Sequence, residues 1–215
     1  MADAPTRTGQ QPDLRAGRPV PGRQVHSELI LGGQKSGKSR RAESLAGEWL
    51  AASPSHKAVL IATAQAWDDE MRARIARHQA DRATRVPQLA TVEEPLALAD
   101  ALLQHSQPDT LVVIDCLTLW LTNLLMPGRP QGLKEKDHFS NMAKAQLAIF
   151  LIAIEKSPGP VLMVGNEIGL GVIPLGRETR AFVDALGVLN QSVAQVCQRV
   201  TLMVAGLPLV LKDAA

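Results

Sequence analysis

The sequence contains no tyrosine and few aromatic residues of any kind. Aromatic residues make up 3% of the 215 residues, whereas hydrophobic residues make up 46%. The core must therefore consist mainly of Leu, Val, Ile and Ala, the mixture typical of parallel strands that helices cover on both faces. The shortage of aromatic rings also disfavours a protein that binds single-stranded nucleic acid, because such proteins stack bases on aromatic side chains.

The chain also lacks a dominant sign of charge. Its formal net charge is +2, and residues 1–25 contribute +2 by themselves, because they contain four arginines and two aspartates. The remaining residues are neutral by this count, which argues against a dedicated nucleic-acid binder with a basic surface. The polar, proline-containing start predicts that residues 1–26 form a disordered extension and residues 27–215 a single domain.

Cysteine is scarce, and no long apolar run is present. Cys116 and Cys197 are far apart, form no C-x-x-C pair and lie in apolar segments. This predicts two buried thiols rather than a disulfide or a metal site. No apolar run is long enough to span a membrane, and the start lacks a signal-peptide core. We therefore expect a cytoplasmic protein without a membrane span.

A phosphate-binding loop with the pattern G-x-x-x-x-G-K-S is the most informative feature that is present. An apolar run at 29–31 precedes it and a helical pattern at 40–50 follows it, a context that distinguishes a P-loop from an ordinary glycine-rich turn. The glycines let successive N–H groups point at phosphate oxygens. Lys38 supplies charge to the β- and γ-phosphates, and the Ser39 hydroxyl can reach Mg²⁺. The predicted nucleotide-binding residues of the loop are Gly32, Gly33, Gln34, Lys35, Ser36, Gly37, Lys38 and Ser39.

Short apolar strands alternate with helical patterns along the rest of the chain. The predicted strands are 58–63, 111–114, 161–164, 200–204 and 209–211, and the predicted helices are 68–82, 92–105, 141–156 and 178–198. An apolar segment at 117–126 leads into a polar break at 127–138. This alternation predicts a three-layer α/β fold with a mostly parallel sheet.

Asp115 directly follows the predicted strand 111–114. A carboxylate at that place is the second signature of a P-loop protein, where it holds Mg²⁺ opposite the hydroxyl of Ser39. An aspartate is also common at the end of any strand, so Asp115 alone would be weak evidence. The presence of the P-loop is what favours the Mg²⁺ role. The sequence therefore predicts a Mg²⁺ site that Ser39 and Asp115 share.

His78 lies within the predicted helix 68–82. Helical spacing puts it on one face with Trp67, Met71 and Ile75, and several arginines lie around this face. One interpretation is a structural histidine on an amphipathic face. The other is a nucleophile that attacks the α-phosphorus of a bound triphosphate. The spacing of the five histidines gives no zinc pattern.

The glycine-rich loop 165–176 follows a predicted strand, so it is expected at the carboxyl edge of the sheet, where open α/β sheets bind ligands. Glu167 could act on a substrate hydroxyl or a metal, or could only cap a turn. Arg177 and Arg180 could hold substrate phosphate, or could be solvated residues at the start of a helix. The residues alone leave these alternatives open.

Taken together, several segments resemble one family closely, the bifunctional adenosylcobinamide kinase/adenosylcobinamide-phosphate guanylyltransferase of cobalamin biosynthesis. They occur in the family's order over residues 28–212 and are GGQKSGKSRRAESLA (32–46), IATAQAWDDEMRARIARHQADR (61–82), VEEP (92–95), VVIDCLTLWLTNLL (112–125), VGNEIGLGVIP (164–174), RETRAFVDALGVLNQ (177–191) and VAGLPLVLK (204–212). The P-loop alone would be generic, whereas DDEMRARIARH combined with NEIGLGVIP is specific.

The resemblance implies a RecA-like P-loop NTPase fold and two reactions. ATP or GTP phosphorylates adenosylcobinamide, and GTP then guanylylates an enzyme histidine with loss of pyrophosphate. The GMP passes to adenosylcobinamide phosphate and gives adenosylcobinamide-GDP. These small molecules would be the partners, with Mg²⁺ as cofactor and no nucleic acid. The resemblance also implies a homo-oligomer, specifically a trimer.

The resemblance carries functional roles onto individual residues. His78 matches the guanylylated histidine. The further matches to nucleotide-contacting positions are Ala62, Thr63, Ala64, Gln79, Ala80, Asp81, Arg82, Glu93 and Asp115. Some relatives have two adjacent histidines where this chain has Arg77 and His78, and the segment before Glu93 is a few residues longer here.

Two other functions remain open from the sequence. The first is an enzyme with kinase activity only, in which His78 is structural. The second is a RecA-like or switch-type NTPase whose hydrolysis drives partner binding. The second is disfavoured because the chain has no basic surface signature and no evident switch or arginine-finger segment.

Overall fold

The structure, a computed structural model, describes residues 25–125 and 136–214, with the side chains of all of these except 136–140. The predicted extension falls almost wholly on residues 1–24 and the predicted polar break mainly on 126–135. Both predictions therefore lie mostly outside the described residues, but residues 136–138, which end the predicted break, are described and are helical.

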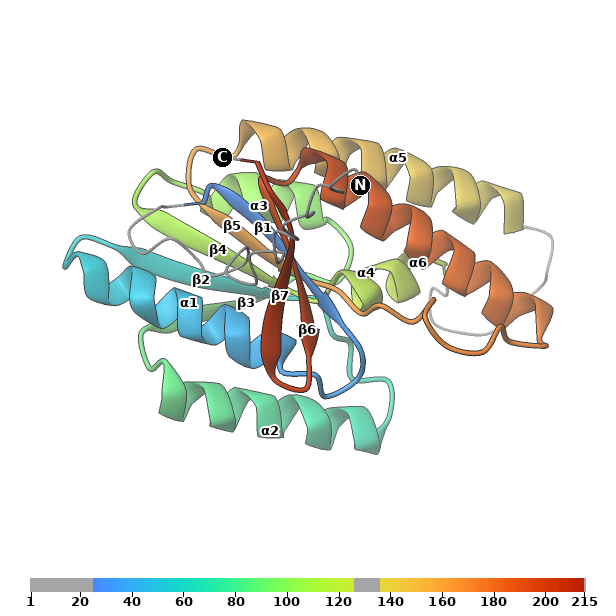
Figure 1. The fold of residues 1–215 in the computed structure, drawn as a ribbon, viewed down its shortest axis with the longest axis horizontal. Helices are drawn as coiled ribbons and strands as arrows, with labels where there is room; N and C mark the ends of the chain where they lie inside the picture. The colour runs from blue at the N-terminus through green and yellow to red at the C-terminus, as the bar shows by residue number, and fades with distance from the viewer. Residues whose placement is uncertain (1–24, 126–135, 215) are drawn as a thin grey trace, which may run out of the picture.

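A seven-stranded sheet forms the centre of the molecule, with the strand order β3-β2-β4-β5-β1-β6-β7 (Figure 1). All neighbouring strands are parallel except β6 and β7, which form an antiparallel hairpin. The prediction of a mostly parallel sheet is therefore confirmed. The strands are β1 (Ser27–Gly32), β2 (Lys57–Ala62), β3 (Leu89–Glu93), β4 (Thr110–Asp115), β5 (Val161–Val164), β6 (Arg199–Val204) and β7 (Leu207–Asp213).

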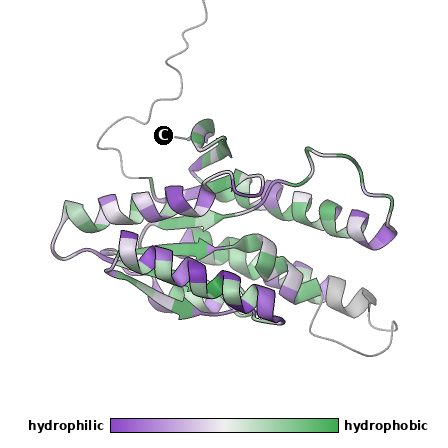
Figure 2. Ribbon diagram, turned by 90° about the horizontal axis from the view of Figure 1, so that it is seen from below, coloured by the Kyte–Doolittle hydropathy of each residue, from purple (hydrophilic) through white to green (hydrophobic). Residues whose placement is uncertain are grey.

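Helices cover both faces of the sheet. They are α1 (Lys38–Ala52), α2 (Asp69–Arg85), α3 (Leu98–His105), α4 (Leu117–Leu125), α5 (Lys136–Lys156) and α6 (Arg177–Val196). In Figure 1, α1 and α2 lie on one side of the sheet and α3 to α6 on the other. The strands are mostly hydrophobic, whereas the helices mix hydrophobic and hydrophilic residues (Figure 2). This arrangement is the predicted three-layer fold.

Two hydrophobic clusters fill the spaces between the layers. The alternation of side chains along a strand sends neighbouring residues to opposite faces. In β4, Val112 and Ile114 join the cluster under α3 to α6, whereas Leu111 and Val113 join the cluster under α1. The strands are therefore buried on both faces, as the aliphatic composition predicts.

The predicted helix at 92–105 is wrong in its first part. Val92 and Glu93 end strand β3, and the helix begins only at Leu98. The cause is local, because Glu94 Oε1 accepts hydrogen bonds from the backbone N–H groups of Leu96 and Ala97. These two bonds form the turn that separates the strand from the helix.

Two further findings bear on the expected environment of the chain. Cys116 and Cys197 are free and buried, which confirms the prediction of two buried thiols. Among the described helices, none combines the length and the hydropathy that crossing a membrane requires.

Candidate active site

The P-loop joins β1 to α1 at the carboxyl edge of the sheet. Gly37 has a φ of 100° and is the residue before the first turn of α1. The loop curls on itself, because Ser36 N donates to Gly33 O at 3.3 Å and Lys38 Nζ donates to the same oxygen at 2.6 Å. The N–H groups of the first helical turn have no partner within the helix, so they can bind phosphate oxygens.

Gly32 has no room for a side chain. A Cβ atom there would lie 2.6 Å from Met203 O of β6 and 2.6 Å from Ser36 Oγ, and its φ is 152°. At Gly33 a Cβ atom would meet nothing within 4 Å. The oxygen Ser36 Oγ is itself buried and has no hydrogen-bond partner in the described part of the chain. An unpaired buried hydroxyl inside a phosphate loop suits a ligand with acceptor oxygens.

Lys38 connects the loop with two other elements. Its side chain is buried, with 8% of the residue exposed. Burial lowers the pKa of Lys38, the neighbouring Cys116 and Asp115 oppose this effect, and the charge of Arg74 adds to it. Asp115 ends β4, and Arg74 belongs to α2. The end of β4 and the first half of α2 therefore lie near the ammonium that would hold the phosphates.

Hydrogen bonds connect the carboxyl ends of the neighbouring strands β2 and β4. Ala62 is paired in register with Asp115, and Thr63 N donates to Asp115 O at 3.2 Å. The buried Thr63 hydroxyl donates to Cys116 O at 2.7 Å and accepts from Cys116 N at 2.9 Å. Asn123 of α4 donates to Thr63 O at 2.8 Å. The predicted segment Ala62, Thr63 and Ala64 thus lies beside Asp115, and Thr63 fixes the backbone there.

Glu93 is paired in register with Ala62, at the end of the edge strand β3. Strands lie about 4.8 Å apart, so β3 is about 19 Å from β1 across the sheet. Gln79 Nε2 donates to Glu93 Oε1 at 3.5 Å. The structure therefore brings Glu93 together with α2 and not with the P-loop.

Helix α2 carries His78. Asp68 caps the helix by accepting a hydrogen bond from Met71 N at 2.7 Å. Of the predicted face, Met71 and Ile75 are half-buried, but Trp67 and His78 are exposed. A histidine whose role was to pack against the core would be buried. His78 is instead open to a ligand.

The carboxyl-terminal half of α2 is tied to the body of the molecule. Arg82 is buried, with 7% of the residue exposed. Arg85 forms an ion pair with the buried Glu43 of α1 and a second one with Asp81 at 3.1 Å. Of the predicted contacts in this half, Ala80 and Asp81 are exposed, whereas Arg82 faces the protein.

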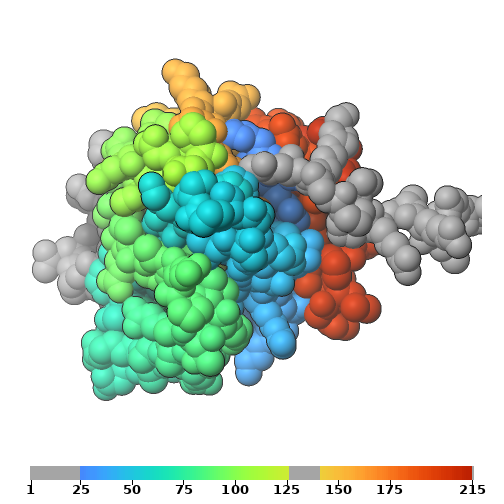
Figure 3. Space-filling model, turned by 90° about the vertical axis from the view of Figure 1, so that its left-hand side faces the viewer, coloured from blue at the N-terminus to red at the C-terminus, as the bar shows by residue number. Residues whose placement is uncertain are grey.

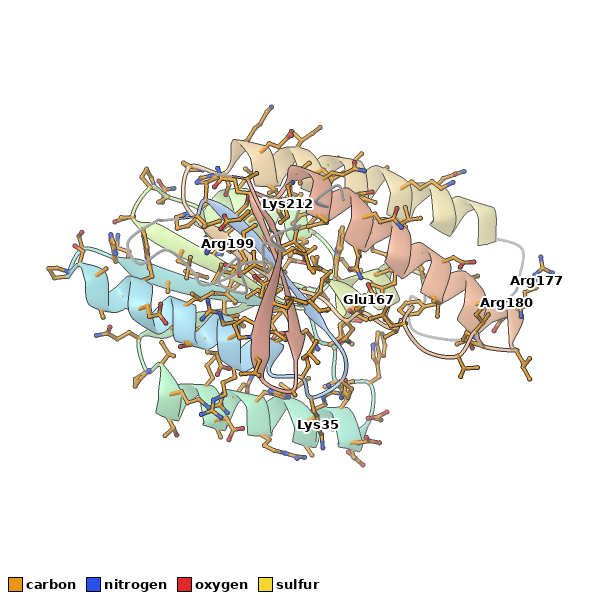
Figure 4. All side chains as sticks on the ribbon, viewed as in Figure 1. Lys35, Glu167, Arg177, Arg180, Arg199 and Lys212 are labelled. Atoms are coloured by element: carbon orange, nitrogen blue, oxygen red, sulfur yellow. The ribbon has the colours of Figure 1, made fainter. Side chains whose placement is uncertain are left out.

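The loop after β5 brings Glu167 to the P-loop. Glu167 N donates to Gly32 O at 3.0 Å, and Asn166 N donates to Thr118 Oγ1 at 2.9 Å. By contrast, Arg180 donates to the backbone oxygens of Pro174 and Leu175 at 3.0 and 3.1 Å. In Figure 4, Glu167 lies near the middle of the molecule and Arg177 and Arg180 at the far end of α6. Of these three residues, Glu167 is the one whose backbone contacts the P-loop in the described structure.

A cavity of about 500 Å³ lies at the opposite edge of the sheet, lined by residues that include Ser53, His56 and Gln88. These residues precede β2 and β3, so the cavity is at the amino ends of the strands, on the side that Figure 3 shows. Ligands of open α/β sheets bind at the carboxyl ends of the strands. The cavity is therefore not the nucleotide site.

A model of the family described as cobinamide kinase / cobinamide phosphate guanyltransferase matches residues 28–211. The chain belongs to this family. The resemblance that the motifs predicted is thus confirmed.

Two relatives illustrate how far the similarity to this family extends. The chain is 47% identical over 186 residues to the bifunctional adenosylcobalamin biosynthesis protein CobP of Pseudomonas aeruginosa, with 86% of this chain and 96% of that protein covered. It is 35% identical over 189 residues to the bifunctional adenosylcobalamin biosynthesis protein CobU of Escherichia coli, with 86% and 98% covered. The flagellar accessory protein FlaH from Methanocaldococcus jannaschii is a distant structural neighbour, with a TM-score of 0.44 and 11% identity over 88% of this chain and 80% of that one.

The donor set at the P-loop of this family member fits Mg²⁺. Magnesium is usually held by one or two protein oxygens together with phosphates and water. The Ser39 hydroxyl and the Asp115 carboxylate are such oxygens, and neither has a hydrogen bond from a side chain in the described residues. The described part of the chain has no cluster of three His, Cys, Asp or Glu side chains that could hold a metal without phosphates.

Sequence reasoning missed two buried asparagines that shape this site. Asn123 holds Thr63, as described above. Asn190 is 4% exposed and donates to Asn166 O at 3.0 Å and to Glu167 Oε2 at 3.4 Å. The signal in the sequence that could have found them was an amide side chain among the apolar residues of each helical segment. Such a residue is expected to have hydrogen-bond partners.

Proposed function

We propose that this enzyme phosphorylates adenosylcobinamide with ATP or GTP and then transfers GMP from GTP, through guanylylated His78, to adenosylcobinamide phosphate. The products of the second reaction are adenosylcobinamide-GDP and pyrophosphate. The observation that carries the proposal is the approach of α2 to the P-loop. The charge of Arg74 acts on Lys38, and the exposed His78 lies one helical turn further along the same face.

In the kinase step, the substrate hydroxyl oxygen attacks the γ-phosphorus, and the bond from that phosphorus to the β–γ bridging oxygen breaks. Negative charge builds up on the oxygens between the two phosphates. Lys38 and the N–H groups at the start of α1 stabilise this charge, because they are already in place when the transition state forms. Mg²⁺, when bound, would neutralise further phosphate charge, and Ser39 and Asp115 would hold it.

In the guanylylation step, an unprotonated nitrogen of His78 attacks the α-phosphorus of GTP. An N–P bond forms as the bond to the pyrophosphate oxygen breaks. Arg74 and Lys38 stabilise the departing pyrophosphate, because both are cations on the same side of the site. An oxygen of adenosylcobinamide phosphate then attacks the same phosphorus, which releases His78 and forms the product.

The remaining nucleotide contacts of the proposal come from the family resemblance. They are Ala62, Thr63 and Ala64 beside Asp115, and Gln79, Ala80, Asp81, Arg82 and Glu93 around α2. The hydrogen bond between Gln79 and Glu93 supports a shared role for these two side chains. The buried, free state of both cysteines supports a cytoplasmic location for the enzyme.

Replacing His78 by asparagine tests the proposal. His78→Asn should form no labelled protein with α-labelled GTP and no adenosylcobinamide-GDP, yet should still phosphorylate adenosylcobinamide. The matched control is His105→Asn, which changes a histidine at the end of α3, on the opposite edge of the sheet. It should label like the parent enzyme, and the label should survive base and be lost in acid, as an N–P bond requires.

Three outcomes would contradict the proposal. Parent-like labelling of His78→Asn would remove His78 from the mechanism and leave a kinase only. A parent enzyme that hydrolyses GTP without phosphorylating adenosylcobinamide would favour the switch-type NTPase. Failure of the parent enzyme to take up label at all would exclude the covalent route.

A further inference from the structure

The backbone of Glu167 is anchored at Gly32, the first residue of the P-loop. Its backbone N–H donates to Gly32 O at 3.0 Å. The next carbonyl oxygen, Gly33 O, accepts from Lys38 Nζ at 2.6 Å. The lysine of a P-loop binds the β- and γ-phosphates. Glu167 is therefore anchored one residue from the group that positions Lys38.

The carboxylate of Glu167 is held in place by neutral donors. Oε1 accepts from Gly169 N at 2.8 Å, and Oε2 accepts from Asn190 Nδ2 at 3.4 Å. A carboxylate has about four acceptor positions, so two of them remain open for a substrate hydroxyl. Glu167 is half-buried, so a ligand at the edge of the sheet can reach it.

The other described carboxylates at this edge have different surroundings. Asp115 ends β4 and is suited to Mg²⁺, and Glu93 is about 19 Å from β1 across the sheet. Glu94 accepts hydrogen bonds from two backbone N–H groups in the turn before α3. Glu167 lies in the loop that follows β5, three residues after Val164, and β5 is paired with β1. It is the described carboxylate best placed to meet a nucleophile at the γ-phosphorus.

We propose that Glu167 is the general base of the kinase step, an inference that rests on the proposed function. Its carboxylate accepts the proton of the substrate hydroxyl of adenosylcobinamide as the hydroxyl oxygen bonds to the γ-phosphorus. The bond to the β–γ bridging oxygen breaks, the nucleoside diphosphate leaves, and Glu167 later releases the proton to water. Asn190 is a positioning residue, because it orients Glu167 and does not itself meet the substrate.

Guanylyl transfer needs no such base. The attacking nitrogen of His78 carries a lone pair and no proton. The attacking oxygen of adenosylcobinamide phosphate is already anionic. Loss of the Glu167 carboxylate should therefore strongly reduce phosphorylation and spare guanylyl transfer, whereas loss of His78 should do the reverse.

Glu167→Gln keeps the size of the side chain and removes its basicity. Its kcat for phosphorylation should fall about 100- to 10,000-fold, the usual contribution of a general base. Three other measurements should each stay within about threefold of the parent, since none of them needs the carboxylate. They are the KM for GTP, the labelling of His78 by α-labelled GTP and the conversion of supplied adenosylcobinamide phosphate. The matched control, Glu155→Gln on the exposed surface of α5, should behave like the parent enzyme.

A second variant guards against a purely structural effect. Glu167→Ala should lose phosphorylation in the same way and regain part of it when formate is added, because formate can replace a missing carboxylate but cannot repair a misfolded loop. Asn190→Ala should lower kcat less than Glu167→Gln does and leave KM for GTP little changed.

The outcomes separate this inference from the proposed function. Parent-like phosphorylation by Glu167→Gln, or equal loss of both activities without rescue by formate, would overturn the role of Glu167 and leave the proposed function intact. A parent enzyme that fails to phosphorylate adenosylcobinamide would overturn the proposed function itself.

Discussion

The ion pair between Arg85 of α2 and Glu43 of α1 should respond unequally to removal of its two partners. The Glu43 side chain is 5% exposed, whereas that of Arg85 is 40% exposed. Arg85→Ala leaves a buried carboxylate without its cation. Breaking a fully buried pair in this way costs about 3–5 kcal/mol, and the partial exposure of Arg85 reduces our expectation to about 2–3 kcal/mol. Glu43→Gln leaves Arg85 in contact with water and Asp81, so it should cost only about 1 kcal/mol.

Urea unfolding followed by circular dichroism measures these free energies. For a domain of this size, 2–3 kcal/mol corresponds to a fall in Tm of roughly 5–10 °C. The double variant Arg85→Ala/Glu43→Gln should be more stable than Arg85→Ala alone, because the stranded charge is gone. The control is the exposed pair of Lys57 and Asp109, where Lys57→Ala should cost less than about 1 kcal/mol.

Equal costs for Arg85→Ala and Glu43→Gln would refute this reasoning. So would a double variant that is less stable than Arg85→Ala. Either result would mean that Glu43 is not an uncompensated buried charge once Arg85 is removed, and that packing rather than the ion pair fixes the end of α2.

Three further predictions concern the loop and the thiols. GTP at 100 times its Kd should stabilise the parent enzyme by about 2.7 kcal/mol and Lys38→Ala by nothing measurable in the same thermal-shift assay. Gly32→Ala should destabilise the fold by about 2–5 kcal/mol through backbone strain and overpacking, whereas Gly33→Ala should stay within about 1 kcal/mol of the parent. Equal midpoints of urea unfolding for the two variants would contradict this. Burial raises the pKa of Cys116 to about 11 and of Cys197 to about 12. Alkylation of both thiols in the native protein at pH 8 should therefore be at least about 100-fold slower than after unfolding, and it should accelerate as pH rises. Equal alkylation rates at pH 8 before and after unfolding would refute the burial of these thiols.

Much of the fold followed from local patterns. Strand β4 is four aliphatic residues flanked by polar ones, and only burial on both faces accommodates such a run, so the strand and its layer were predictable. The segment 92–105 was not, because its helical stripe of apolar residues begins at Leu96 and no strong local signal separates it from Val92 and Glu93 of the strand. Hydrogen bonds to the Glu94 side chain form the turn between the strand and the helix, and such a turn is only a weak signal in a single sequence.

The candidate site divides in the same way. The sequence by itself determined the phosphate loop, because residues 32–39 are contiguous and carry all the groups that bind phosphate. It also determined the family, through motifs that keep their order along the chain. Only the tertiary structure decided that Arg74 approaches Lys38, that Glu167 meets Gly32, and that Arg177 and Arg180 lie elsewhere. Those contacts depend on the order of strands in the sheet and on how α2 and α6 cross it. Long-range packing sets both, and no local pattern encodes them.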